Sequence, residues 1–143
     1  MGLDMFLSAR RYISKYVDEN ESNNLDNLYP GRHVKGVTFE VGYWRKANAI
    51  HNFFVENCQG GKDECQETYI DPDDLKSLLL TVNDVLADRS KAMELLPPVS
   101  GFFFGSTEID DWYFEYLERT KNIIEDALSG KYEDCDFYYQ SSW

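Results

Sequence analysis

Five carboxylates in the last third of the chain follow the spacing of a helix. Steps of three, four, three and seven residues place their side chains on one face: Glu108, Asp111, Glu115, Glu118 and Glu125. Like charges at such steps repel one another and lower the stability of the helix. A protein that keeps them presents a negative field that attracts a basic partner, and the row resembles DNA phosphates in the order of its charge spacing. The alternative interpretation is a hydrated outer face of an acidic protein.

A second group of side chains could bind an anion. Trp44, Arg45 and Lys46 stand where a predicted strand gives way to a predicted helix, and His51 follows about one turn further along. Arg45 and Lys46 oppose the dipole at a helix N-terminus unless they hold a phosphate or a carboxylate there. His51 has the chemistry of a general acid or base. In the alternative interpretation, the two cations pair with surface acids and His51 makes a satisfied hydrogen bond at the edge of the core.

Segment 101–107 has the glycines of a phosphate-binding loop but not its pattern. Gly105 is followed directly by Ser106, and the lysine that precedes the hydroxyl residue in such loops is missing. We expect Phe102–Phe104 to be buried as an apolar plug ahead of a helix. Exposed, the same three rings would form a patch for binding a partner.

The sequence predicts no metal site, no cofactor and no catalytic centre. Six residues separate Cys58 from Cys65, which is not the spacing of a zinc knuckle, and the chain has two histidines, His33 and His51. The nucleophile motif Gly-x-Ser-x-Gly does not occur. These observations favour a protein that is not an enzyme.

Several segments have the periodicity of strands or helices. Two segments alternate and predict strands, one with Leu3, Met5, Leu7 and Ala9 on a face and one with Val37, Phe39, Val41 and Tyr43. The aromatic segment 136–143 predicts a third strand. Helices are expected over about 45–58, from a cap at Asp71 to about 88, and from a Ser106 or Thr107 cap to Gly130.

These elements predict a single α+β domain over residues 1–143. We expect an antiparallel or mixed sheet of about three strands, covered by three main helices. A chain of 143 residues that is 43% hydrophobic and 15% aromatic has enough apolar material for one core. A polar segment without periodicity, around residues 18–33, predicts a mobile loop.

Charge and composition limit the partners. The net charge of -12 argues against direct nucleic-acid binding, and no apolar run of membrane-spanning length occurs. We expect no secretion signal, and the three cysteines fit a reducing cytoplasm. Residues 1–46 hold seven basic and six acidic side chains, whereas residues 47–143 hold seven and twenty, so the surface should be polarised.

Four segments resemble a family of small bacteriophage proteins. They are Gly-Leu-Asp-Met at 2–5, Val-Gly-Tyr-Trp-Arg-Lys-Ala-Asn-Ala-Ile-His at 41–51, the block at 101–107, and Asp-Phe-Tyr-Tyr at 136–139. The resemblance implies a setting, the cytoplasm of an infected bacterium, where inhibitors that imitate DNA are a recurrent phage strategy. It brings no activity and no site residue to this chain.

Two functions are therefore expected as alternatives. The first is a non-enzymatic phage accessory protein whose acidic helix face binds a host protein, such as a defence or nucleic-acid-handling factor. The second is a protein, or an enzyme, that holds a phosphate-bearing metabolite or nucleotide between Arg45, Lys46 and His51. The second alternative predicts a concave pocket at the end of the strand near 37–44, with Arg10 or Arg11 converging on it.

Overall fold

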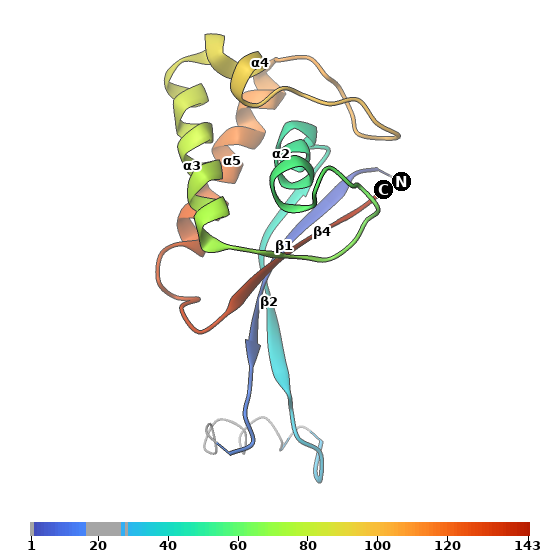
Figure 1. Cartoon of the computed structure of the whole chain (residues 1–143), viewed down its shortest axis with the longest axis vertical. Helices are drawn as coiled ribbons and strands as arrows, with labels where there is room; N and C mark the ends of the chain where they lie inside the picture. The colour runs from blue at the N-terminus through green and yellow to red at the C-terminus, as the bar shows by residue number, and fades with distance from the viewer. Residues whose placement is uncertain (1, 17–26, 28) are drawn as a thin grey trace.

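The computed structural model describes residues 2–16, 27 and 29–143, which form a single α+β domain. Four strands make one antiparallel sheet in the order β2-β1-β4-β3 (Figure 1). Their bounds are β1 (Asp4–Tyr12), β2 (Gly36–Arg45), β3 (Thr68–Ile70) and β4 (Asp136–Ser142). The predicted loop around residues 18–33 lies largely outside the described residues.

Three main helices pack together on one face of this sheet, as expected. They are α2 (Asn48–Cys58), α3 (Pro72–Ala87) and α5 (Asp111–Ala127), with the short turns η1 (Arg89–Lys91) and α4 (Ala92–Leu95) between the last two. Beyond the helices, β1 and β2 continue as a two-stranded ribbon (Figure 1). Among the described residues, no helix is long and apolar enough to cross a membrane.

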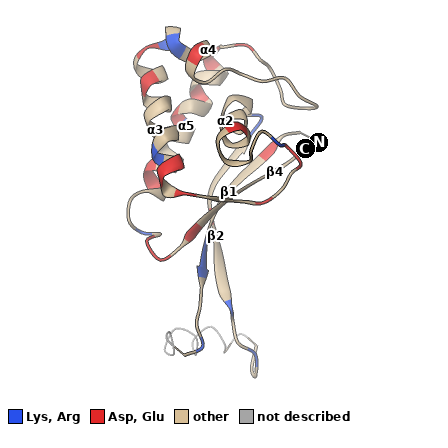
Figure 2. Ribbon diagram, viewed as in Figure 1, with Lys and Arg blue, Asp and Glu red and all other residues tan. Residues whose placement is uncertain are grey.

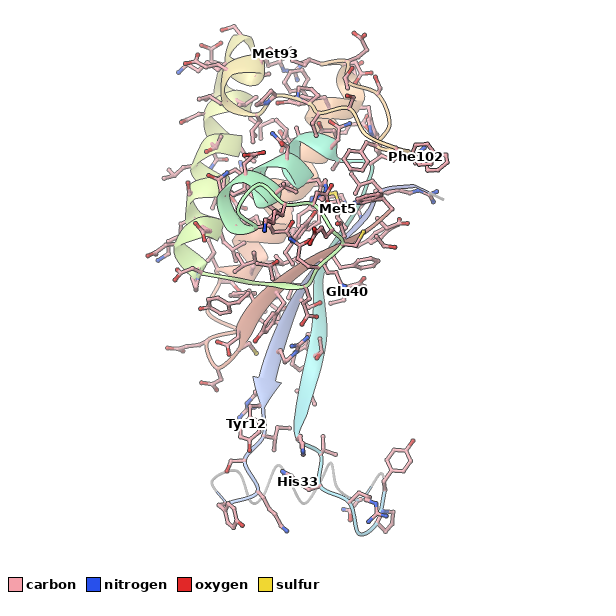
Figure 3. All side chains as sticks on the ribbon, turned by 45° about the vertical axis from the view of Figure 1, so that its right-hand side comes forward. Met5, Tyr12, His33, Glu40, Met93 and Phe102 are labelled. Carbon is pink, nitrogen blue, oxygen red and sulfur yellow. The ribbon has the colours of Figure 1, made fainter. Side chains whose placement is uncertain are left out.

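The core lies between the sheet and the helices. The alternation predicted for β1 is confirmed, because Leu3, Met5, Leu7 and Ala9 are all fully buried. In Figure 3, Met5 lies among side chains beneath α2, whereas Tyr12 and His33 lie far out toward the end of the ribbon. Helix and strand residues complete the cluster, among them Trp44, Ile50, Phe54, Leu78, Leu117, Ile124 and Tyr139.

A β-bulge at Val41 decides which side chains of β2 reach this core. Leu7 pairs with Gly42 but Ser8 pairs with Glu40, so Val41 has no partner residue on β1. The bulge turns the alternation over, and Gly42 and Trp44 are buried while Tyr43 is not. A Cβ atom at Gly42 would lie 2.4 Å from Cγ2 of Ile123, so α5 packs directly on the backbone of β2.

Two helix starts can be compared with their predicted caps. Asp71 caps α3 as expected, because its carboxylate accepts the Asp73 N–H at 2.8 Å. The cap predicted for α5 is wrong: Asp110 caps this helix, accepting the Tyr113 N–H at 3.1 Å. Ser106 does not cap α5. The Asn48 amide donates to the Ser106 carbonyl oxygen at 2.9 Å, and this hydrogen bond keeps the segment against α2.

Charges are distributed unevenly over the fold. Figure 2 shows most acidic residues on the helices and on the loops near them, while basic residues lie along the ribbon of β1 and β2 and also on α3 and beside α4. This distribution agrees with the charge difference between the two parts of the sequence. The helical end of the molecule is therefore the place to look for an acidic surface.

Candidate functional site

Four of the five predicted carboxylates lie on the exposed face of α5. We call them the acidic row: Asp111, Glu115, Glu118 and Glu125, each exposed to solvent. Glu108 is a correction, since it lies two residues before the cap Asp110 and therefore outside the helix. It is exposed, and its N–H donates to the hydroxyl of Ser106 at 3.0 Å.

The opposite face of α5 fixes the helix in place. It carries apolar side chains at helical spacing, and its buried residues include Tyr113, Tyr116, Leu117, Thr120 and Ile124. The hydroxyl of Tyr113 donates to the Leu96 carbonyl oxygen at 2.7 Å, which ties the first turn of α5 to the end of α4. The acidic row therefore stands on a rigid element whose other side is part of the core.

No ion pair between described residues involves the acidic row. One cation, Arg89, lies in a hollow of about 270 Å³ beside the row, which we call the acidic hollow; its lining is Arg89, Asp111, Phe114, Glu115 and Glu118. The Arg89 guanidinium lies over the Phe114 ring, 4.1 Å from its centroid. Three carboxylates around one guanidinium leave the hollow negative and suited to a cationic side chain.

A larger hollow lies on another flank of α5, against the end of β2. This arginine hollow, as we call it, has a volume of about 400 Å³ and is lined by Tyr43, Trp44, Arg45, Trp112, Glu115, Tyr116, Arg119 and Asn122. The ligand-binding alternative predicts a pocket at this end of β2. Two of the predicted anion-site residues, Trp44 and Arg45, line the hollow. Glu115 lines both hollows.

Arg119, and neither Arg10 nor Arg11, joins Arg45 in the arginine hollow. The Arg119 Nε–H donates to the Tyr43 carbonyl oxygen at 3.1 Å. Arg10 instead makes an ion pair with Glu67 at 2.9 Å. Both Arg10 and Arg11 line a separate hollow near the ribbon.

Trp44 and Lys46 of the predicted anion site make contacts within the fold. Trp44 is buried, and its indole N–H donates to the Thr120 hydroxyl at 2.9 Å. Lys46 adopts a left-handed backbone, with φ of 56°, and its N–H donates to the Leu3 carbonyl oxygen at 2.8 Å. The Lys46 side chain packs against Gly105 and does not line the arginine hollow.

His51 is buried, with 1% of its surface exposed, and it faces β4 rather than the arginine hollow. Its Nδ1 lies 2.6 Å from the Tyr139 hydroxyl and its Nε2 lies 2.9 Å from a carboxylate oxygen of Asp63. Burial raises the pKa of Tyr139 well above its ordinary value, so the phenol stays protonated. The other carboxylate oxygen of Asp63 accepts the Trp143 indole N–H at 3.0 Å. Both ring nitrogens are occupied within the fold.

The expectation of a buried Phe102–Phe104 plug is only partly right. Phe104 is 6% exposed, whereas Phe102 and Phe103 are 74% and 42% exposed. The Phe104 N–H donates to the Gly101 carbonyl oxygen at 3.2 Å, and this tight turn directs one ring inward and two outward. Phe104 packs on the ring of His51, with centroids 5.2 Å apart.

Cysteine and metal chemistry find little support in the described part of the chain. Burial, and secondarily the nearby Asp74 carboxylate, raises the pKa of Cys58 to about 12, so its thiol is a poor nucleophile. Cys58, Cys65 and Cys135 are free thiols. Among the described residues, no group of three or more His, Cys, Asp or Glu side chains is placed to hold a metal ion.

Trp112, Arg119 and Asn122 are site residues that the sequence does not single out. Trp112 is 50% exposed, and Arg119 lies four residues after Glu115, a spacing typical of an ordinary helix ion pair. Only the packing of α5 on β2, which is not local in sequence, brings Arg119 beside Arg45.

The fold and these surfaces define the class of the molecule: a small α+β domain with an acidic helix face that adjoins an arginine-lined hollow. Comparison with protein-family models, with curated proteins and with solved structures finds no match for this chain.

Proposed function

We propose that this chain is a phage accessory protein, not an enzyme, which binds a basic protein of the infected bacterium through the acidic row. The observation that carries the proposal is the state of Asp111, Glu115, Glu118 and Glu125, which are exposed and unpaired among the described residues. Repulsion along the helix has a cost, and a cationic partner removes it.

The surroundings of the acidic row support a protein partner. The acidic hollow offers three carboxylates to a lysine or arginine side chain, next to the Phe114 ring that Arg89 already covers. Trp112 is half exposed on the same helix, and tryptophan is enriched among the residues that dominate binding energy at protein interfaces. The partner would present a groove rich in lysine and arginine.

A basic groove of this kind is the surface with which a protein binds nucleic-acid phosphates. The acidic row would occupy it as an imitation of DNA, and the host protein would be a defence factor or another nucleic-acid-handling factor. The resemblance to phage proteins supports this setting in the cytoplasm of the infected cell. The proposal therefore makes the chain an inhibitor that competes with nucleic acid for its target.

The test compares two variants with the same change in net charge. One reverses the acidic row to lysine at all four positions; the control reverses four exposed acids away from α5, at Glu56, Asp84, Glu94 and Glu133. Each protein is immobilised and incubated with lysate of the bacterial host, and bound proteins are quantified by mass spectrometry. We expect a protein that the unmodified chain and the control retain and the row variant loses.

Two further measurements on the captured protein decide the mechanism. Its affinity should fall steeply as ionic strength rises, because exposed charges are screened within about 8 Å at physiological salt. Duplex DNA should compete with the chain and release the captured protein from it. Retention by the row variant with its fold intact, or binding indifferent to salt, would contradict the proposal.

A further inference from the structure

The arginine hollow combines side chains that recognise an anion with side chains that recognise a planar ring. Its volume of about 400 Å³ lies within the range of pockets for small ligands. Its charged lining residues are two arginines and one glutamate, so it is locally positive in a chain whose net charge is -12. This reversal of sign sets it apart from the acidic hollow on the other flank of α5.

Its two guanidinium groups are available to a ligand. The Nε–H of Arg119 is held by the Tyr43 carbonyl oxygen, which fixes the plane of the guanidinium, and its terminal nitrogens make no hydrogen bond to described residues. Arg45 is exposed and has no ion pair among the described residues; its guanidinium lies near Gly2. Both arginines line the same hollow, and an anion held there could accept charge-assisted hydrogen bonds from each of them.

The other lining residues fit a ring that carries polar groups. Trp112 is half exposed, and its contact with Tyr116 is edge-on, with ring centroids 6.4 Å apart. An exposed indole is a stacking platform for a planar heterocycle. Glu115 can accept from ring N–H groups or sugar hydroxyls, and the Asn122 amide can both donate and accept.

We propose that the arginine hollow binds a nucleoside monophosphate. The phosphate lies between Arg45 and Arg119, the base stacks on Trp112, and Glu115 and Asn122 contact polar groups of the base or ribose. The walls come from β2 and α5, which are held together by the packing of Ile123 on Gly42. The site shares Trp112 and Glu115 with the proposed partner surface, whereas Asp111, Glu118 and Glu125 do not line it.

The experiment is a calorimetric titration of the full chain with AMP, GMP, CMP and UMP, followed by thermal unfolding with the same compounds. At least one nucleotide should bind and raise the melting temperature. Inorganic phosphate and the matching nucleoside should each bind at least about tenfold more weakly, because each retains one of the two contacts.

Variants then assign the binding to this hollow. Arg45→Ala, Arg119→Ala and Trp112→Ala should each weaken nucleotide binding by about tenfold or more. Arg32→Ala is the matched control, because it removes an exposed arginine at the far end of the molecule and should leave binding unchanged. Glu118→Lys together with Glu125→Lys should leave nucleotide binding intact while weakening capture of the basic partner, which separates this site from the proposed function.

Three results would overturn the proposal. The first is no binding of any of the four nucleotides at millimolar concentration. The second is equal binding by unmodified chain and Arg119→Ala. The third is a 5′-phosphorylated oligonucleotide that binds while the free nucleotides do not, since the ligand would then be a nucleic-acid end.

Discussion

The two faces of α5 carry opposite chemistry on one helix. The buried face, with Tyr113, Tyr116 and Thr120, packs on α3 and β2, and the exposed face holds the acidic row. The buried side chains are satisfied, as the Tyr113 hydroxyl shows by donating to the Leu96 carbonyl oxygen. The exposed carboxylates have no such partners among the described residues. The buried face of α5 therefore contributes to the stability of the domain and the exposed face to its proposed binding, so a substitution on one face can leave the other unaffected.

High pH should perturb the buried face most strongly. Burial raises the pKa values of Tyr113, Tyr116 and Tyr139 above the ordinary value of 10.0. Because the folded protein holds these protons more tightly than the unfolded chain, their stabilisation is complete below pH 10 and is lost as pH rises above it. Together they should lower the free energy of unfolding by up to about 4 kcal/mol per pH unit.

Urea unfolding at pH 9, 10 and 11 measures this loss. Tyr113→Phe should make the dependence on pH shallower, whereas Tyr12→Phe, an exposed tyrosine on the ribbon, should leave it unchanged. Equal stability at pH 9 and pH 11 would mean that these phenols are hydrated, and the contrast between the faces would then be lost.

A substitution where α5 packs on β2 should affect both stability and ligand binding. A methyl group at Gly42 would collide with Ile123, so Gly42→Ala should destabilise the domain by about 1–3 kcal/mol. The same variant should bind the nucleotide more weakly, because the two walls of the arginine hollow move apart. Chemical unfolding and titration measure the two effects.

Combining Gly42→Ala with Ile123→Ala tests whether the loss of stability comes from the contact between these two residues. Ile123→Ala should cost stability alone but restore part of it in combination with Gly42→Ala, because it provides room for the new methyl group. Simple additivity of the two substitutions would show that Gly42 and Ile123 do not meet.

The sequence predicts those parts of this arrangement that depend on local periodicity. The alternation of Leu3, Met5, Leu7 and Ala9 and the helical spacing of the acidic row each follow from the period of one element, and the structure confirms both. Asp71 is recognisable because a cap, a proline and two carboxylates stand together. The exposure of the acidic row follows from the same helical period.

Other parts depend on contacts that no local pattern contains. The three residues of β3 are too few to show a period, and the bulge at Val41 inverts the face of β2 with only the neighbouring Gly42 as a local signal. Arg119 becomes a neighbour of Arg45 only through tertiary packing. For the same reason His51, predicted beside Arg45, instead bonds to Tyr139 on a strand that is 88 residues away in sequence.

The smallest expected effect concerns the exposed face of α5. It shows whether the charges of the acidic row repel one another or are paired with cations. Glu118→Gln removes a charge three residues from Glu115 and far from the helix dipole ends, so it should stabilise the domain by about 0.2–0.5 kcal/mol at low salt. In 1 M salt the gain should vanish, because screening then acts within about 3 Å. Thermal unfolding of the variant, with Glu133→Gln as an exposed control outside the helix, measures the difference. Destabilisation by Glu118→Gln would instead mean that Glu118 is paired with a cation, either Arg89 across the acidic hollow or Lys121 three residues along the helix, and a row neutralised in this way would not attract a basic partner.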